Sequence, residues 1–298
     1  KPLYALSLAT LGASVGLAIT PDVAAAMIAW APAMVVAAAL GMVAAIVMTP
    51  VLAGLGKMGR STAFFSLLPG GVIEMANVGD RFGADRTTVA SLHAVRVGLV
   101  VGLLPLGLLA FGEPSDAALQ ATPYLPSPLL AAVICLGLVG GWAAAKTGLP
   151  AAWLLGALLL VGVVSSFGVF AGRMPQPLLA VVQVLVGISL GARFQRSRLS
   201  TIPRAVAAGL PVILIIMAFM ASAAVIAGLV IPFALPTLIL CFSIGGMAEM
   251  VLTAKAHGQN VALVAAFQAI RAVLVNAFAG PLWRRLAPSP NISDSPEG

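Results

Sequence analysis

Long stretches of this chain are continuously apolar, without the regular polar positions that mark a helix or strand facing water. Such runs cover residues 129–145, 151–170, 205–231 and 261–282, and similar ones recur along the whole length. Each run reaches or approaches the roughly 20 residues that an α-helix needs to cross the hydrocarbon core of a bilayer. The pattern therefore predicts an all-α protein, a polytopic bundle of transmembrane helices.

The composition points to the same class of protein. Hydrophobic residues make up 61% of the chain and charged residues 8%, whereas about a quarter of the residues in a soluble domain are charged. The net charge of +7 comes from basic residues in short loops, where such residues set the orientation of a membrane protein. No basic face with interleaved aromatic residues indicates nucleic acid. We expect the lipid bilayer as partner, at the inner (plasma) membrane, and no nucleic acid.

A repeat runs through the chain at an offset of 175 positions. This shift aligns two copies of the pattern G-G-x-x-E-M, here called the GGxxEM motif, and an arginine that follows each copy. The aligned residues are Gly70, Gly71, Glu74, Met75 and Arg96 with Gly245, Gly246, Glu249, Met250 and Arg271. Matches of glutamate and arginine are informative because charged residues are rare in this chain. An internal duplication is therefore expected.

The duplication divides the chain into two membrane repeats. Residues 128–175 hold two expected helices that have no counterpart before Lys1. We therefore place a first repeat, truncated at its N-terminus, at 1–113 and a second at 128–288, joined by a loop at 114–127. We also expect residues to be missing upstream of Lys1. A polar, proline-containing tail, 289–298, has nothing to bury and is expected to be disordered.

The two segments around the motif, LLPGGVIEMANVGDRFGADRTTVASLHAVRVGLVVGLLP and FSIGGMAEMVLTAKAHGQNVALVAAFQAIRAVLVNAFAGPL, resemble those of AbrB-type membrane proteins with a duplicated domain. Members of that family have been labelled regulators of gene expression and ammonia monooxygenases, and neither label can be derived from these residues. The second copy has Ile244 where the first has Pro69, and Gln268 where the first has His93. Equivalent roles for the two copies are therefore left open.

The basic residues predict the topology. The densest basic loop is expected in the cytoplasm; it holds Arg193, Arg196, Arg198 and Arg204. If the chain crossed the membrane fully at each motif, four further basic residues would lie outside. A re-entrant or broken helix at each motif instead returns them to the cytoplasm; they are Lys57, Arg60, Arg284 and Arg285. A complete repeat then has five crossings, so the two repeats are inverted. Inverted repeats with discontinuous helices are typical of secondary transporters.

Four charged residues are expected at membrane depth, namely Glu74, Glu249, Arg96 and Arg271. A charge there costs about 2.5 to 3.5 kcal/mol even on the lenient insertion scale, so it is usually paired or functional. We interpret the four as substrate- or ion-binding residues, with salt bridges that pin each motif to the following helix as the structural alternative. Both arginines should face the bundle interior, with Glu74 near Arg96 and Glu249 near Arg271, or in crossed pairs.

The glycines of the motif and one histidine complete the candidate site. Gly70, Gly71, Gly245 and Gly246 would let backbone approach a ligand or expose N–H groups to an anion, or they simply allow close helix packing. His93 lies one turn before Arg96 and could titrate near neutral pH. A packed polar role is the alternative, because Gln268 takes its place in the second copy.

Two enzyme interpretations fail on context. Gly12, Ser14 and Gly16 spell G-x-S-x-G, but a nucleophile elbow needs a strand-to-helix turn and a histidine partner. Inside an apolar helix, small residues at this spacing pack helices together. His93, His257 and two isolated cysteines are too few for a copper or iron site. We therefore predict no catalytic residue, no metal and no cofactor.

The sequence thus favours a permease or secondary transporter of a small solute, with an anion as one option for that solute. The alternative is a membrane-embedded regulator or sensor that affects gene expression indirectly. A homo-oligomer is left open.

Overall fold

The computed structural model describes residues 2–109, 123–147, 151–170, 172–191 and 203–287. Within these residues the chain is helical, and the predicted all-α fold is confirmed. Three arginines of the basic loop, Arg193, Arg196 and Arg198, lie outside the described residues, as do most of the loop at 114–127 and the tail at 289–298.

The described helices follow the predicted apolar runs. The first six are α1 (Pro2–Gly16), α2 (Pro21–Ala29), α3 (Ala31–Gly56), α4 (Arg60–Leu67), α5 (Val72–Asp80) and α6 (Arg86–Leu109). The others are α8 (Ser127–Lys146), α9 (Ala152–Ser166), α10 (Gln176–Gly191), α12 (Pro203–Ala227), α13 (Leu235–Phe242), α14 (Met247–Ala256) and α15 (Val261–Leu286). Among the described helices, five are long and apolar enough to cross a membrane, α3, α6, α8, α12 and α15. The chain is therefore an integral membrane protein.

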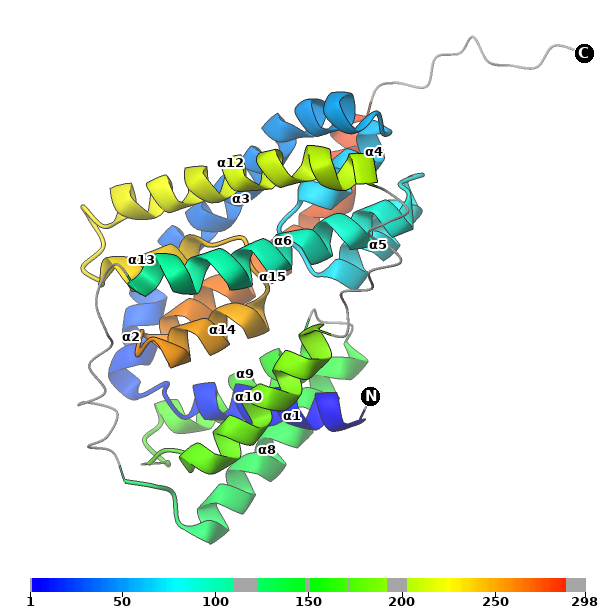
Figure 1. Ribbon diagram of the computed structural model, residues 1–298. Coiled ribbons are helices and arrows are strands. Elements are labelled where there is room, and N and C mark those ends of the chain that lie inside the picture. Colours follow the sequence, from blue (N-terminus) through cyan, green and yellow to red (C-terminus); the bar gives the residue numbers. More distant parts are fainter. Residues whose placement is uncertain (1, 110–122, 148–150, 171, 192–202, 288–298) are drawn as a thin grey trace, which may run out of the picture.

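The helix bounds agree with the offset of 175 positions. Helix α4 spans 60–67 and α13 spans 235–242, while α5 and α14 begin at 72 and 247, and α6 and α15 begin at 86 and 261. In Figure 1, α3 and α12 run in opposite directions, and the pair α4–α5 lies toward the opposite end of the long helices from α13–α14. This arrangement agrees with inverted repeats, while the boundaries of the two repeats stay a prediction.

One short helix, α2, begins at a proline, Pro21, and covers residues 21–29. Proline is well suited to the first position of a helix because its missing N–H would be unsatisfied there in any case. The following alanines, with Met27 and Ile28, then continue the helix.

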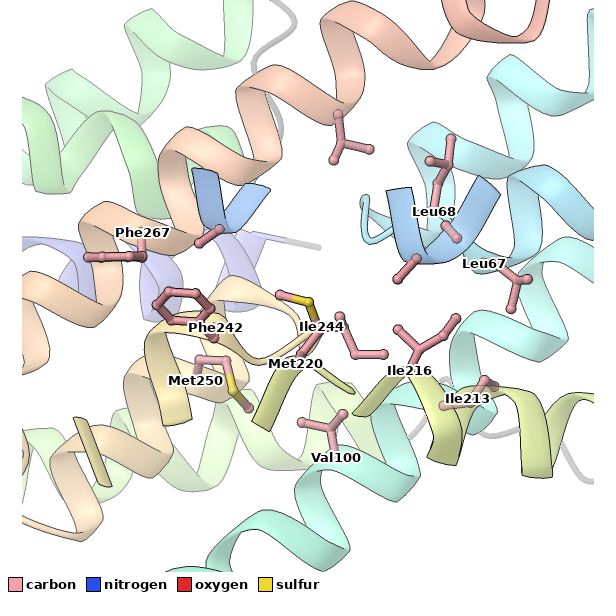
Figure 2. Close-up of a cluster of buried hydrophobic side chains, with 14 of the residues drawn as sticks. Leu67, Leu68, Val100, Ile213, Ile216, Met220, Phe242, Ile244, Met250 and Phe267 are labelled. Carbon is pink, nitrogen blue, oxygen red and sulfur yellow. The ribbon is translucent and has the colours of Figure 1, made fainter. Parts of the chain in front are cut away.

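Two groups of helices share the core. The largest hydrophobic cluster joins helices α3–α6 to α12–α15. Figure 2 shows part of it, with Leu68 and Ile244 from the two motif segments and Ile216 and Met220 from α12. Helices α1, α8, α9 and α10 form a second group, and residues of α14 and α15 pack into its cluster. Helix α14 therefore borders both groups.

Glycine lets the helices of the second group approach closely. A Cβ on Gly16 would lie 2.8 Å from the Gly162 nitrogen and 2.9 Å from the Leu158 oxygen of α9. The Ser14 hydroxyl donates to the Leu11 carbonyl in its own helix, at 2.8 Å. The G-x-S-x-G stretch is therefore a helix-packing surface, as small residues at this spacing often are in membranes.

Candidate functional site

Both GGxxEM motifs lie where a helix is interrupted. Helix α4 ends at Leu67 and α5 begins at Val72, with Gly71 in an extended conformation at φ −71° and ψ 146°. The second motif repeats this geometry between α13 and α14, where Gly246 has φ −76° and ψ 156°. The predicted broken helices are therefore present in both copies. Pro69 is not required for the break, because Ile244 stands at the corresponding position.

The first glycine of each motif makes room for the methionine five residues later. A Cβ on Gly70 would lie 2.8 Å from Cγ of Met75, and a Cβ on Gly245 would lie 2.7 Å from Cε of Met250. Both methionines are fully buried. The first glycine therefore serves close packing rather than an unusual backbone conformation.

The second glycine makes room for the glutamate. A Cβ on Gly71 or Gly246 would overlap Oε2 of the glutamate three residues later. Glu74 and Glu249 thus fold back over the first turn of their own helices, α5 and α14, where a negative charge is favoured by the free N–H groups and the helix dipole. The glycines therefore shape a pocket for each motif's own carboxylate.

The arginines that follow the motifs face the interior. Arg96 on α6 is 2% exposed, and its guanidinium donates to the Leu68 and Gly70 carbonyls at 2.8 and 2.9 Å. Arg271 on α15 donates to the corresponding carbonyls of Ser243 and Gly245. Each arginine thus supplies donors to backbone carbonyls at the break, where the regular helical hydrogen bonds are interrupted. Each arginine therefore links its motif to the following helix, as expected, but it binds the backbone carbonyls of the motif rather than the glutamate.

The charges of the two copies meet, although the expected direct ion pairs are not formed among the described residues. Glu249 is buried, and its carboxylate acts electrostatically on both Arg96 and Arg271. The two guanidiniums also act on each other. Glu249 of the second copy therefore lies close enough to Arg96 of the first for an electrostatic interaction, without a direct ion pair among the described residues. Glu74 is half-buried and lies over α5.

His93 and Gln268 have the same contact in the two copies. Nε2 of His93 lies 2.9 Å from the Phe65 carbonyl, and Nε2 of Gln268 lies 2.8 Å from the Leu240 carbonyl. A carbonyl can only accept, so Nε2 of His93 carries the proton. These residues join α6 to α4 and α15 to α13. The two differing residues thus share one equivalent hydrogen bond, and Gln268 has longer contacts with the Cys241 and Ser243 carbonyls in addition.

Sequence reasoning missed a further pair of equivalent contacts at the start of α6 and α15. The backbone N–H of Asp85 donates to Thr62 at 2.9 Å, and that of Asn260 donates to Thr237 at 3.4 Å. Asp85 and Asn260 also accept from backbone N–H groups in the first turn of the helix that follows each. An Asp or Asn directly before an apolar run is the signal that could have identified these caps.

A cavity of about 1250 Å³ lies elsewhere, among the ends of α1, α10 and α14 and the connector between α9 and α10. Its polar lining includes Ser14, Arg173, Gln183 and Lys255. None of the predicted site residues is among the described residues that line it. The described residues hold no group of three or more His, Cys, Asp or Glu placed to hold a metal ion.

Comparison with known proteins identifies the family. A family model described as "Transition state regulatory protein AbrB" matches residues 1–287, so the chain belongs to the AbrB family. A Bacillus subtilis relative, "Uncharacterized protein YhjN", is 29% identical over 77% of this chain and 64% of its own length. "Putative regulator AbrB" of Escherichia coli is 26% identical over 71% of this chain and 62% of its own length. The chain thus spans less than two thirds of either relative. No solved structure matches it.

Proposed function

We propose that this protein is a permease or secondary transporter that moves a small solute across the inner membrane. The observation that carries the proposal is the pair of broken helices at opposite ends of the long helices, with their buried charges gathered in one cluster. Paired discontinuous helices commonly form the substrate and ion sites of secondary transporters. The proposal assigns no catalytic residue, metal or cofactor to the chain.

The hydrogen bonds at each break suit a broken helix that moves together with the long helix that follows it. Arg96 and His93 hold the first broken segment to α6, and Arg271 and Gln268 hold the second to α15. Each broken pair is thus tied to one long helix. Movement of one such unit relative to the other would change the distance between Glu249 and Arg96, which belong to different units. The carboxylate is therefore placed to respond to the conformational change.

The experiment begins with the solute. The purified full-length protein is screened by thermal shift against a library of small metabolites, because a ligand that binds only the native state raises its stability. Compounds that bind are then tested for uptake into proteoliposomes. Empty liposomes are the control for passive leakage. Failure of every binding compound to enter proteoliposomes would contradict transport.

The variant Glu249→Gln separates a functional from a structural role. It removes the charge and keeps the size and most of the hydrogen-bonding capacity of the side chain. We expect a folded protein, with normal gel filtration and thermal unfolding, in which uptake falls by at least about tenfold. Glu74→Gln is the matched variant in the other copy and should have the smaller effect, because Glu74 is less buried. Loss of expression instead of uptake would support a purely structural role.

A regulatory function is the second candidate, and the name of the Escherichia coli relative favours it. A regulator of this architecture would act on gene expression indirectly, through its membrane segments. Transcript levels in cells that carry wild-type or transport-deficient protein distinguish the two. A regulator would keep its effect in Glu249→Gln cells with no uptake, whereas a transporter would influence transcripts only through the solute that it moves.

A further inference from the structure

The cavity among α1, α10 and α14 is built from segments that lie far apart in the chain. Ser14 comes from α1, Arg173 from the connector after α9, Gln183 from α10 and Lys255 from the last turn of α14. Its volume of about 1250 Å³ exceeds the roughly 300–1,000 Å³ of most ligand pockets. A small solute would therefore fit together with some of its water.

Lys255 brings an incompletely satisfied cation to this cavity. Its ammonium group has one hydrogen-bond partner among the described residues, the Ser14 hydroxyl at 3.4 Å. An ammonium group carries three donors, so two remain for another partner. The lining of the cavity also contains apolar residues, among them Leu17, Leu179 and Val261. A positive charge in such a place attracts a counter-charge more strongly than one in open water.

Arg173 supplies a second cation to the same cavity. Its backbone is fixed by two hydrogen bonds with the segment before α8, from Leu125 to the Arg173 carbonyl and from Arg173 to the Pro123 carbonyl, both 3.0 Å. The guanidinium lies over the Tyr124 ring, 4.5 Å from its centroid. Nε of Arg173 is buried and has no hydrogen-bond partner in the described part of the chain. The backbone hydrogen bonds and the Tyr124 ring therefore hold Arg173 in position at the cavity.

The cavity has no acidic group among its described lining residues, and its other polar groups are neutral. Besides Ser14 and Gln183 they include Thr20, Ser165 and Gln176. The repeat does not explain Lys255, because Asp80 stands at the equivalent position, 175 residues earlier. The positive charge that Lys255 brings to the cavity is therefore present in one copy only and lies at one end of the protein.

We infer that this cavity binds a small oxyanion, of the carboxylate or phosphate class, between Lys255 and Arg173. Arginine is suited to two-point contact with such groups, and lysine acts as a point charge. The side-chain amide of Gln183 can donate to the remaining oxygens. Helix α14 leads from Lys255 toward the break at Gly246. The inference deepens the proposed function, because it gives the class of the solute and the place where it first binds.

A free anion fits better than the headgroup of an anionic lipid. A lysine that meets lipid headgroups is expected at an exposed helix end beside an interfacial aromatic residue. Lys146 has that setting, because it is exposed in the last turn of α8 and lies 3.5 Å from the centroid of the exposed Trp142 ring. Lys255 also lies in the last turn of its helix, but it faces the cavity. Lys146 is therefore the matched control residue.

The test measures binding of inorganic phosphate and of succinate to the full-length protein in a neutral detergent, by calorimetry at constant ionic strength. Succinamide serves as the uncharged control for succinate. We expect at least one anion to bind with saturation and succinamide not to bind. Lys255→Gln and Arg173→Gln should each weaken binding by about tenfold or more, as expected for loss of a charged hydrogen bond. Lys146→Gln should bind like the wild type.

Other results would overturn the inference. Equal binding by all variants would indicate a general salt effect, and absence of saturable binding by either anion would remove the site. If phosphatidylglycerol bound in a Lys255-dependent manner while both small anions did not, the site would belong to a lipid headgroup. Because Arg173 lies in a connector, Arg173→Gln keeps the test informative if Lys255→Gln does not fold.

These experiments distinguish failure of anion binding from failure of transport. Anion binding that depends on Lys255, without uptake into proteoliposomes, would support the cavity site and contradict the transporter. Uptake of a solute that is unchanged in Lys255→Gln and Arg173→Gln would support the transporter and overturn the cavity site.

Discussion

At the scale of single residues, the two copies of the motif place equivalent side chains against the same backbone atoms. Each arginine donates to two carbonyls of the break. His93 donates to the Phe65 carbonyl, and Gln268 donates to the equivalent Leu240 carbonyl and, over longer distances, to those of Cys241 and Ser243. Every residue has a backbone carbonyl that can accept a hydrogen bond, whatever its side chain. Different side chains can therefore do the same work in the two copies, provided that each presents a donor.

Replacement of His93 tests this equivalence. His93→Gln should destabilise the protein less than His93→Ala, because glutamine makes the same contact in the second copy. His93→Ala leaves the buried Phe65 carbonyl without its donor and should cost about 1–3 kcal/mol. Thermal unfolding of the purified protein in detergent measures both. If His93→Gln abolished uptake while the protein stayed folded, the histidine would have a role in proton transfer that glutamine cannot fill.

The first glycine of the motif gives a second prediction. Gly70→Ala brings a Cβ to 2.8 Å from Cγ of the fully buried Met75, and overpacking of this kind usually costs about 1–3 kcal/mol. Gly102→Ala on α6 is the control, because a Cβ there meets no heavy atom within 4 Å. We expect a lower unfolding temperature only for Gly70→Ala. Equal unfolding temperatures would show that the methionine is free to move aside.

The interior position of Arg96 and Arg271 could be predicted from sequence, because an unpaired arginine facing lipid is costly. Their partners could not be predicted in the same way. Glutamates were the expected partners since they are visible in the sequence, whereas the carbonyls of Leu68 and Gly70 become acceptors only once the helix breaks. Lys255 and Arg173 were missed as cavity residues because no repeat or motif marks them.

At the scale of helices, the short segments on either side of each break depend on caps. Asp85 precedes α6 and accepts from the backbone of Thr87 and Thr88, both at 3.1 Å, and from the Thr88 hydroxyl. Asn260 precedes α15 in the same way and accepts from the backbone N–H of Leu263. Because the N–H of each residue also bonds to a threonine of the preceding short helix, the cap joins the two helices that flank the motif.

The cap predicts a pH effect. Burial raises the pKa of Asp85, but the hydrogen bonds from Thr88 and Thr87 outweigh it and hold the pKa below its ordinary value of 3.8. A carboxyl with a lowered pKa stabilises the fold above the unfolded-state value and loses that contribution as the pH falls through and below it. Between about pH 5 and pH 3, wild type should therefore lose more stability than Asp85→Asn. Thermal unfolding at both values measures this difference.

A matched substitution checks that the cap matters at neutral pH. Asp85→Ala should cost about 1 kcal/mol, as loss of an N-cap usually does, and Asp85→Asn should cost less. If all three proteins showed the same acid dependence, the titrating group would lie elsewhere.

The order and type of the long helices followed from apolar runs that only a membrane can accommodate. The breaks were predicted as well, because a full crossing would have moved four basic residues to the wrong side. Helix α2, with nine residues, was not predicted by any long apolar run. A short apolar segment does not reveal by itself whether it turns or continues as a helix.

At the scale of the whole molecule, the described helices form two groups that meet at α14 and α15. The group that holds the breaks has an apolar interior in which residues of both motif segments pack together (Figure 2). The cavity lies instead beside the second group. This division could not be predicted from the sequence, because it depends on which helices pack together, and α1 contacts α8, α9 and α10 across more than a hundred residues.

The last prediction concerns the orientation of the two motifs in the membrane. Gly59 precedes α4 and Ala234 precedes α13, at equivalent positions 175 residues apart, and both are exposed. Charge bias places the end of α3 near Gly59 in the cytoplasm. An inverted pair of repeats then places Ala234 outside. Single cysteines at the two positions should therefore react with a membrane-impermeant thiol reagent from opposite sides.

The background for this experiment can be made without disturbing the core. Cys135 is exposed and can be replaced by alanine, and the buried Cys241 can be replaced by serine, because Ser66 has the equivalent position in the first copy. Gly59 has an extended conformation and room for a side chain, so Gly59→Cys should be tolerated. We expect Ala234→Cys to be labelled in intact cells and Gly59→Cys only in inverted vesicles. Labelling of both cysteines from one side would mean that the two broken helices enter the membrane from the same face. A transporter that exposes its site alternately to the two sides would then lose this structural support.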